Sequence, residues 1–477
     1  MTKHLIKRIK TSTCILNGTG GLADTFLSFG IATLLMPIYN IGMGIDAKLL
    51  GLAMIIPRVL DAITDPLMGN ISDNTRSRFG RRRQYIFAGV IMCALLFPFI
   101  WMPPAGSQGV VLGYLVGAMC LHSIFYTIFA VPYSALSYEI TSDYDERTRL
   151  LAWRLYFSTV AGVTIQWLYK LCLMAGDTEV EGVRVVSVAI AVVVLIFGII
   201  PPIFTREQDV VETQEKVNLF KALGYVVQNK AFRIMMISFI IVVTLLFSTG
   251  SMGLYINIFY VFDGDKDAAA TVMSTVGTIL IAFAFIGMLI MKKVSELTGK
   301  KAAILIAMGV ALFGVLVSWF TLRPNTSGIW WHSAALQCIH CVFTGAGVQG
   351  CWLLFASILG DVCDDDELRT GLRQEGVYSA ANGFVTKCAQ ALVILGAAVM
   401  LEFAGYVGGT DPTPEIAFRM KVVFIVVQVI GLGAGLALMA FFPIGRKRAE
   451  ETRRILDERK KNAEQQPAAE HPDIIQK

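Results

Sequence analysis

The chain has 477 residues, of which 55% are hydrophobic and only 16% charged, and its mean hydropathy is +0.62. A soluble domain carries about 25% charged residues, so this composition argues against a soluble enzyme and against a nucleic-acid-binding protein with an exposed basic domain. Apolar runs of about 20 residues, the length of a helix that crosses a bilayer, recur along the whole chain. The composition therefore predicts an all-α polytopic membrane protein.

Twelve transmembrane helices are expected in chain order. We place them at residues 13–40, 47–71, 84–104, 109–138, 149–175, 183–204, 231–262, 267–292, 302–322, 331–360, 375–404 and 417–444. The longest polar connection divides them six plus six. This predicts an N-terminal bundle (1–204), a connecting loop (205–230), a C-terminal bundle (231–444) and a charged tail (445–477) that begins as a short helix.

The distribution of Lys and Arg predicts the orientation. The N-terminus, the loops after each even-numbered span and the tail carry nearly all of them, whereas the loop "PPAGSQG" after the third span has none. By the positive-inside rule both termini are cytoplasmic, and we expect the bacterial inner membrane. Nine cysteines lie mostly in apolar segments, and "CIHC" (Cys338 to Cys341) lacks a second ligand pair. We expect these cysteines to pack between helices rather than to bind a metal.

The two halves resemble each other. "YEITSDYDERT" (Tyr138 to Thr148) matches "GDVCDDDELRT" (Gly360 to Thr370) at an offset of 222 residues, and "FGRRR" after span 2 finds a weaker echo in "TGKK" after span 8. Such loops in the same relative place indicate a duplicated six-helix unit. Duplication is typical of transporters that rock one half against the other, although channels and membrane enzymes can also be duplicated.

Span 2 carries charges inside its apolar stretch. Arg58, Asp61 and Asp65 have the spacing i, i+3 and i+7 and so form one helical stripe. A charged side chain at the bilayer centre costs at least about 2.5–3.5 kcal/mol, so these charges need partners. One interpretation is a set of structural ion pairs. The other is a cation site, in which Arg58 favours ionised carboxylates and close like charges favour a shared proton.

Further polar groups lie at similar depths. Asp24 in span 1 and Lys387 in span 11 are roughly 16 and 20 Å from the cytoplasmic boundary, at about 1.5 Å per residue. Arg154 in span 5 offers a hydrogen-bonding fork, and Trp352 in span 10 offers an aromatic face, both suited to a sugar. Each residue alone is equally compatible with ordinary ion pairing or packing.

The loop after span 2, "GNISDNTRSRFGRRR", combines glycines, an acid and several arginines. We expect Asp73 to pair with Arg76 or with a neighbouring helix end and so to close the cytoplasmic side, with Arg82 as part of that gate. The alternative is a basic topology signal without further function.

These motifs resemble a known family. The pattern Gly-x₃-Asp…Gly-Arg-Arg-Arg is similar to the signature of the major facilitator superfamily. "RVLDAITDPLMGNISDNTRSRFGRRR", "VPYSALSYEITSDYDERTRLLAWR" and "GDVCDDDELRTGLRQEGVYSAANGFVTK" resemble its glycoside–pentoside–hexuronide:cation symporters, of the melibiose-permease type. The resemblance runs from span 1 to span 12. It implies two six-helix bundles around a central cavity with alternating access.

The resemblance also implies roles for single residues. Asp61 and Asp65 match the cation-coordinating carboxylates, and we add Asp24 as a further candidate. The matched positions of the sugar and ion site are Arg154, Trp352 and Lys387, and Tyr126 borders that site. Arg373 and Glu375 match the inner gate, to which we add Arg58 for its place on the charged stripe.

The sequence departs from the family pattern at several of these positions. Thr25 stands where the melibiose-type protein has a sugar-binding acid, with Asp24 one residue earlier. Ala130 replaces another acid, and His122 and Ser134 replace aromatic residues. Because the site has lost an anionic ligand, we expect weak Na⁺ dependence or a role for the pH gradient instead. His122 is a polar substrate contact, a proton carrier or a residue that bonds a neighbouring helix.

The sequence therefore predicts a secondary active transporter, without cofactor, that couples H⁺ or Na⁺ to a sugar, glycoside or sugar acid and works as a monomer. The alternatives are a carrier of a lysolipid or an organic anion in the same fold, a facilitator without coupling, and a transport-like sensor. No nucleophile–base pair, metal cluster or phosphate loop indicates an enzyme.

Overall fold

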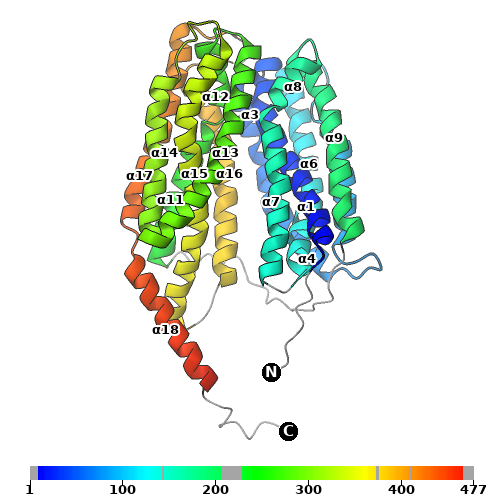
Figure 1. Ribbon diagram of the computed structural model, residues 1–477. Coiled ribbons are helices and arrows are strands. Elements are labelled where there is room, and N and C mark those ends of the chain that lie inside the picture. The colour runs from blue at the N-terminus through cyan, green and yellow to red at the C-terminus, as the bar shows by residue number, and fades with distance from the viewer. Residues whose placement is uncertain (1–8, 142–143, 206–227, 372–374, 408–409, 466–477) are drawn as a thin grey trace.

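The computed structural model describes residues 9–141, 144–205, 228–371, 375–407 and 410–465, and in these ranges the chain forms helices and no strand (Figure 1). The N-terminal elements are α1 (Thr11–Thr25), η1 (Phe26–Gly30), α2 (Ile31–Met36), η2 (Pro37–Gly42), α3 (Ala47–Ala53), α4 (Ile55–Asn74), α5 (Arg83–Phe99), α6 (Gln108–Glu139), α7 (Tyr144–Gln166), α8 (Leu168–Ala175) and α9 (Glu179–Phe204). The C-terminal elements are α11 (Lys230–Ser248), α12 (Met252–Tyr255), η3 (Ile256–Val261), α13 (Lys266–Thr298), α14 (Lys300–Thr321), α15 (Trp330–Thr370), α16 (Glu375–Phe403), α17 (Pro414–Ala440) and α18 (Arg446–Gln465).

Nine helical segments within the described ranges are long and apolar enough to cross a membrane, and α5 is a shorter apolar helix. The remaining two expected spans are more polar. The chain turns at Met54 between α3 and α4, and α4 carries three charges within its apolar stretch. The other of these two, the fifth expected span (149–175), breaks at Trp167 between α7 and α8. The all-α membrane fold is thus confirmed, while the count of twelve spans stays a prediction.

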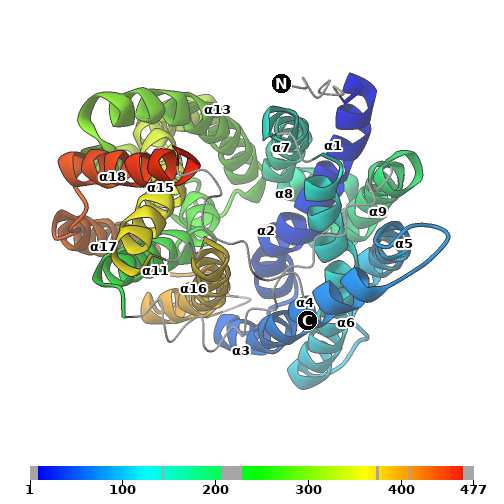
Figure 2. The same ribbon diagram turned by 90° about the horizontal axis from the view of Figure 1, so that it is seen from below.

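The helices pack as two groups, which we call the N-terminal group (α1–α9) and the C-terminal group (α11–α17). Figure 2 shows them side by side, with α7 beside α13 and α3 beside α16. One apolar core is built almost entirely from the N-terminal group, and a second from the C-terminal group alone. Most apolar contacts therefore lie within a group, which leaves the boundary between the groups free for polar residues.

Glycines bring α1 against α7. A Cβ atom built on Gly21 would lie 2.6 Å from the carbonyl oxygen of Arg154, and one on Gly18 would lie 2.9 Å from the backbone of Trp153. Small residues at helix crossings let backbones approach closely in membrane proteins. The "GTGGLAD" sequence of α1 thus fixes the distance between Asp24 and Arg154, which lie next to these crossings.

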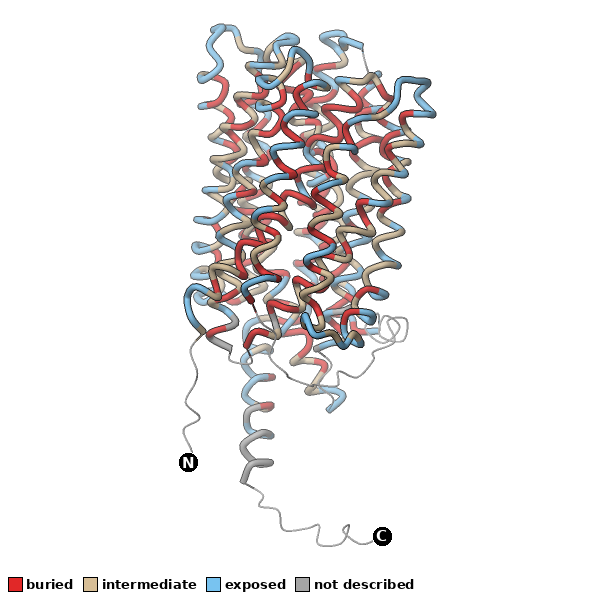
Figure 3. Tube along the Cα trace, turned by 90° about the vertical axis from the view of Figure 1, so that its right-hand side faces the viewer, coloured by how far each residue is buried: buried red, intermediate tan, exposed pale blue. Residues whose placement is uncertain are grey.

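The outer surface is apolar along the whole height of the helices. Large hydrophobic side chains such as Leu95, Met174 and Phe320 are 66%, 71% and 76% exposed. Figure 3 shows exposed positions running along the helices as well as in the loops. Contiguous apolar surface of this extent is unstable in water, so it indicates contact with lipid.

The two ends of the molecule differ in how they join the groups. We call the end that carries α18 and the start of α1 the terminal face, and the opposite end the distal face (Figure 1). Contacts between the groups gather at the distal face: Lys48 with Glu402, Lys266 with Glu179, Lys170 with Asp267, and Tyr255 with Asn40. At the terminal face, the ion pairs between described residues either stay within one group or join α18 to α15 of the C-terminal group. Among the described residues, the groups are therefore joined by ion pairs at the distal face and not at the terminal face.

The end of α15 differs from the one expected. α15 continues to Thr370, ten residues beyond the expected end at residue 360, because "DVCDDDELRT" contains no glycine or proline and its Asp366 pairs with Arg369 at i+3. The helix stops at Gly371, whose φ of 73° is left-handed. The tail forms the expected helix, α18. Most of the connecting loop (206–227) lies outside the described residues.

Replacing Gly21 by alanine tests the close crossing of α1 and α7. Since its Cβ would meet a backbone oxygen that cannot move alone, we expect Gly21→Ala to lower stability by about 1–3 kcal/mol, the usual range for overpacking. Thermal unfolding in detergent measures this. Gly117→Ala in α6, whose Cβ would meet nothing within 4 Å, is the control and should not destabilise. Equal stability of the two variants would contradict the crossing.

Candidate functional site

The first polar cluster lies within the N-terminal group and joins α1, α6 and α7. The Arg154 guanidinium donates to Asp24 at 2.9 Å, and the Tyr126 hydroxyl donates to the other oxygen of Asp24 at 2.8 Å. Arg154 also lies 4.6 Å from the ring centre of Tyr133 and 3.4 Å from the Ser134 hydroxyl. Asp24 and Arg154 are each only about 20% exposed, so one ion pair neutralises two largely buried charges.

The second cluster begins at Asp61 on α4. Arg58, one turn earlier, lies 3.3 Å from one carboxylate oxygen, and the Ser123 hydroxyl on α6 donates to the other. The stripe expected from the sequence therefore exists, and its first two members pair with each other. α6 adds a hydroxyl partner that the sequence analysis did not select.

Asp65 connects the two groups of helices. It accepts a hydrogen bond from the Thr127 hydroxyl at 2.7 Å, and its other oxygen accepts from the Lys387 ammonium of α16. Thr64 extends the polar surface, since its hydroxyl lies 3.2 Å from that of Thr127. Lys387 remains 43% exposed and Asp65 26%, so this ion pair faces open space rather than a sealed core.

The charges of the two clusters balance. Three carboxylates (Asp24, Asp61, Asp65) face three cations (Arg154, Arg58, Lys387), each in its own pair. An additional cation at the carboxylates therefore has to compete with a side chain already bound there. Lys387 is the most exposed of the three cations, and it approaches its carboxylate from the other group, so its pair is the one best placed to be exchanged.

Thr25 and His122 hold local positions. The Thr25 hydroxyl donates to the Gly21 carbonyl at 2.7 Å within its own helix. His122 is buried, with its Nε2 atom 3.2 Å from the Leu27 carbonyl oxygen, and its ring is stacked on Tyr126 with 6.0 Å between centroids. Its Nδ1 atom has no hydrogen-bond partner among the described residues. The His122 ring thus packs against the Tyr126 ring, on the helix that brings Tyr126 to Asp24.

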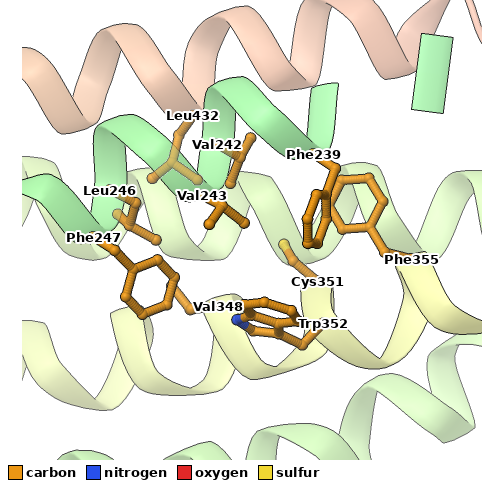
Figure 4. Close-up of a pocket in the computed structure, with 10 residues that line it drawn as sticks. All are labelled: Phe239, Val242, Val243, Leu246, Phe247, Val348, Cys351, Trp352, Phe355 and Leu432. Carbon is orange, nitrogen blue, oxygen red and sulfur yellow. The ribbon is translucent and has the colours of Figure 1, made fainter. Parts of the chain in front are cut away.

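Trp352 lies apart from the charges, in a small apolar pocket of the C-terminal group. Figure 4 shows its indole below Phe247, with Phe239 and Phe355 at the other side of the pocket. Its ring makes an edge contact with Phe239 at 5.3 Å between centroids. Among the described residues, no hydrogen bond joins Trp352 to either polar cluster. In this arrangement the indole continues an apolar surface.

The gate residues Asp73 and Arg82 meet at the terminal face. Arg82 donates to Asp73 at 2.6 Å and to Glu139, at the end of α6, at 2.6 and 2.9 Å. Arg81 donates to Glu139 at 2.6 Å as well. Asp73 therefore pairs with Arg82 and, within the described contacts, not with Arg76. We call Asp73, Arg81, Arg82 and Glu139 the N-terminal clamp.

The clamp shifts the titration of Glu139, which lies beyond the apolar part of α6. Burial opposes ionisation, but hydrogen bonds from Arg82 and Arg81 and the charges of both outweigh it, so the pKa of Glu139 is lower than usual. Since "YEITSDYDERT" was the repeated motif, Glu139 was visible in the sequence as part of that motif, but its partners were not.

The C-terminal group repeats this arrangement. Asp361, which matches Glu139 at the offset of 222, accepts from Lys300 at 2.7 Å. Lys301 donates to the Phe442 carbonyl at 2.7 Å near the end of α17, just as Arg83 donates to the Pro202 carbonyl near the end of α9. Cations at the carboxyl ends of helices are favourable for the helix dipole. The weak echo between "FGRRR" and "TGKK" thus has a structural counterpart.

Two expected gate residues cannot be placed. Arg373 lies outside the described residues, and Glu375 opens α16 with a side chain that is not described. Within the described residues, no group of three or more His, Cys, Asp or Glu side chains is arranged to hold a metal ion.

Glutamine at position 139 tests the N-terminal clamp. Because the pKa of Glu139 is lower in the folded protein than the unfolded value of about 4.3, its stabilisation is complete above that pH and is lost as the pH falls through the folded-state pKa. We expect Glu139→Gln to melt at a lower temperature than the parent at pH 7, and to lose less on acidification. Glu415→Gln, which removes an exposed distal-face pair, should match the parent at both pH values. A parent-like acid response of Glu139→Gln would refute the clamp.

Comparison with known proteins agrees with this architecture. The glucuronide carrier protein homolog of Escherichia coli is 25% identical over 94% of this chain and 95% of its own. The sodium-dependent lysophosphatidylcholine symporter 1-B of Danio rerio is 24% identical over 88% of this chain and 84% of its own. The solved structure of the nucleoside transporter NupG shares the fold, with a TM-score of 0.63, 13% identity and coverage of 91% of this chain and 99% of that one. The model of the family "MFS/sugar transport protein" matches residues 16–446, and the chain therefore belongs to this family of membrane transporters rather than to any class of enzymes.

Proposed function

We propose that the protein is a secondary active transporter that couples a cation, H⁺ or Na⁺, to the symport of a sugar, glycoside or sugar acid by alternating access. The observation that carries the proposal is the Asp65–Lys387 pair, which joins the two helix groups at mid-height while the other described contacts between charged residues of the two groups lie at the distal face. Whether this ion pair forms depends both on a cation bound at Asp65 and on the relative position of the two groups.

The moving bodies in this proposal are residues 1–204 and 231–444, with 205–230 as the connection and 445–477 as the tail. The terminal face bears the arginine-rich loop after α4 and the basic helix α18, so the positive-inside rule supports cytoplasmic termini. Contacts at the distal face then make this an inward-facing state. We propose the bacterial inner membrane as location and a monomer as the working unit, since one chain contains both polar clusters.

Coupling follows from competition at Asp65. A proton or Na⁺ that binds Asp65 weakens its attraction for Lys387, and the link between α4 and α16 is released. The Thr64 and Thr127 hydroxyls lie close enough to add oxygen ligands for Na⁺, whereas a proton needs the carboxylate alone. With Ala130 in place of an acid, the site offers few charged oxygens, which supports the proton as coupling ion.

The Asp24 cluster supports a hydroxyl-bearing or anionic solute. Arg154 has a planar set of donors, and Tyr126 adds a hydroxyl, so a sugar or carboxylate can replace part of their hydrogen bonding to Asp24. The Escherichia coli relative is named a glucuronide carrier homolog, which agrees with a sugar acid. We assign the solute contacts to Arg154, Tyr126, Lys387 and Trp352, with Thr25 and His122 at the border.

A lysolipid is the second candidate because hydrocarbon and aromatic side chains surround Trp352 and give it an apolar surface, although the cavity there is too small to hold an acyl chain in this state. The Danio rerio relative carries a lysolipid in its name. A thermal-shift screen separates the candidates: purified protein is heated with melibiose, methyl β-D-glucuronide, D-xylose or lysophosphatidylcholine, each with and without Na⁺. A ligand that binds the folded state raises the melting temperature by mass action.

Asparagine at position 65 tests the coupling. We expect Asp65→Asn to abolish accumulation against a gradient, because the amide cannot exchange a cation for Lys387. Counterflow of labelled against unlabelled solute should survive in part, since it needs only the solute site and the movement of the groups. Vesicles with an imposed pH or Na⁺ gradient measure both for the ligand found in the screen, and the gradient that drives uptake identifies the ion.

The control is Asp267→Asn, which removes the exposed acid of a distal-face pair and should leave accumulation driven by the same gradient. Accumulation by Asp65→Asn at the level of the parent would show that its carboxylate is structural. Counterflow and uptake that are both independent of any gradient in the parent protein would indicate a facilitator without coupling.

Alanine at position 352 tests the solute contact. We expect Trp352→Ala to weaken binding of the screened ligand about tenfold, the loss of roughly one aromatic contact, while Arg154-dependent recognition remains. Trp331→Ala, at an exposed indole near the distal face, is the matched control. Unchanged affinity of Trp352→Ala would exclude the pocket in Figure 4 from the solute path.

A further inference from the structure

A lysine lies inside the apolar part of α17 without an acidic partner. Lys421 is 5% exposed, and among the described residues it forms no hydrogen bond and no ion pair. Its ammonium lies over two aromatic rings instead, 5.2 Å from the ring centre of Tyr260 and 5.0 Å from that of Trp319. The Phe418 ring packs against both of them, with 6.0 and 6.3 Å between centroids. We call Tyr260, Trp319 and Phe418 the aromatic box of Lys421.

The aromatic box leaves the charge of Lys421 incompletely satisfied. An ammonium has three N–H donors, and a ring face attracts its charge without offering an oxygen acceptor. The acid in the first turn of α17, Glu415, is already bound by Arg419 at 2.6 Å. The Nζ atom of Lys421 is not among the fully covered polar atoms that lack a partner, so an atom from outside can touch it. Charged residues within membrane spans normally have a counter-charge, and Lys421 therefore indicates an anion that is not part of the chain.

The depth of the aromatic box matches the headgroup region of a membrane. α17 begins at Pro414 at the distal face, and Lys421 lies about 10 Å further along the helix. Side chains of a helix point back toward its N-terminus, so the ammonium of Lys421 reaches toward the distal face. There it meets Trp319, close to the end of α14 at Thr321. Trp and Tyr gather at this depth in membrane proteins, and long lysine side chains extend their charge to it.

The aromatic box lies on the lipid-facing side of the C-terminal group. Figures 1 and 2 show α17 at the edge of this group that faces away from the N-terminal group. Trp319 and Phe418 are 40% and 42% exposed, and Phe320, which follows Trp319, is 76% exposed. These exposed rings offer acyl chains an apolar surface directly beside the charge of Lys421.

We propose that the aromatic box is a binding site for an anionic phospholipid of the membrane leaflet at the distal face. A phosphate oxygen accepts a hydrogen bond from the Lys421 ammonium, and the acyl chains lie along the exposed rings of Trp319 and Phe418. A zwitterionic lipid carries its own cation beside the phosphate, so its attraction to Lys421 is weaker. The lipid is a resident partner and not the solute, and this inference goes beyond the transport function proposed above.

Native mass spectrometry of the delipidated protein in a neutral detergent tests the site, with dioleoylphosphatidylglycerol as the anionic lipid and dioleoylphosphatidylcholine as the zwitterionic one. We expect the parent to bind phosphatidylglycerol more tightly than phosphatidylcholine. Lys421→Met should weaken phosphatidylglycerol binding about fivefold, which is the contribution of one lysine near a membrane surface, and should leave phosphatidylcholine unchanged. Lys421→Arg should keep the preference, because a guanidinium also binds phosphate.

The matched control is Arg419→Met, which removes one positive charge from the same end of α17 but lies outside the aromatic box, in an exposed pair with Glu415. It should bind phosphatidylglycerol as the parent does. An equal loss in Arg419→Met and Lys421→Met would show general attraction to a basic surface, and no loss in Lys421→Met would show that the rings alone satisfy the lysine; either result overturns the proposal. If Lys421→Met does not fold, Lys421→Gln replaces it, and equal binding of the two lipids by the parent overturns the proposal without any variant.

A water-soluble headgroup separates a lipid from a free phosphate. Glycerol 1-phosphate lacks acyl chains, so it should not displace phosphatidylglycerol when both are present at the same concentration. Displacement in the parent that is lost in Lys421→Met would assign the aromatic box to a free phosphate and would overturn the lipid site. These measurements need neither solute nor ion gradient, so their outcome does not depend on the proposed transport activity.

Discussion

The structure depends on the neutralisation of charge at mid-membrane, and above all on the pair between Asp65 and Lys387. A lone charge there costs at least about 2.5–3.5 kcal/mol, so neither residue is stable in the bilayer without the other or a substitute. The two lie on α4 and α16, in different helix groups. Because an unpaired charge is costly, the protein favours the arrangement of the two groups in which Asp65 and Lys387 stay paired. In the coupling proposed above, a small cation that binds Asp65 replaces Lys387 as its partner, and ion binding and movement become linked in the thermodynamic sense.

The two groups divide the chemistry unequally although they arise from one repeat. All three mid-membrane carboxylates and Arg154 belong to the N-terminal group, whereas the C-terminal group supplies Lys387 and the apolar pocket at Trp352. α13, at the repeat position of α4, has no charge in its apolar stretch. The repeat is visible in the ion pairs at the ends of α6 and α15. It is absent at mid-height, where the proposed solute and cation contacts lie.

The sequence was sufficient for the all-α membrane fold, the clustering of Asp61 and Asp65, and the equivalence of Glu139 and Asp361, because hydropathy, helical spacing and repeat offset are local properties. It was not sufficient for partners on other helices. Ser123 and Thr127 are two hydroxyls among many in apolar helices, and only the packing of α4 on α6 selects them. The motif in α15 was interpreted as a loop because its acids are polar. A run of acidic residues that contains no glycine or proline can also continue a helix into water, and the end of α15 does so.

Arg453 shows how the same reasoning extends beyond the membrane. Asp361 is buried at the end of α15, and two cations donate to it, Lys300 and Arg453 of α18. In the N-terminal group one loop provides both cations of the clamp. In the C-terminal group Lys301 donates at the end of α17 instead, and α18 supplies the second cation. A tail that appeared to be only a charged extension in the sequence is therefore bound to the transmembrane body by the same electrostatic requirement that joins Asp65 to Lys387. The difference is that water and salt reach the exposed arginines of the tail, so its ion pairs are screened more than those between the transmembrane helices.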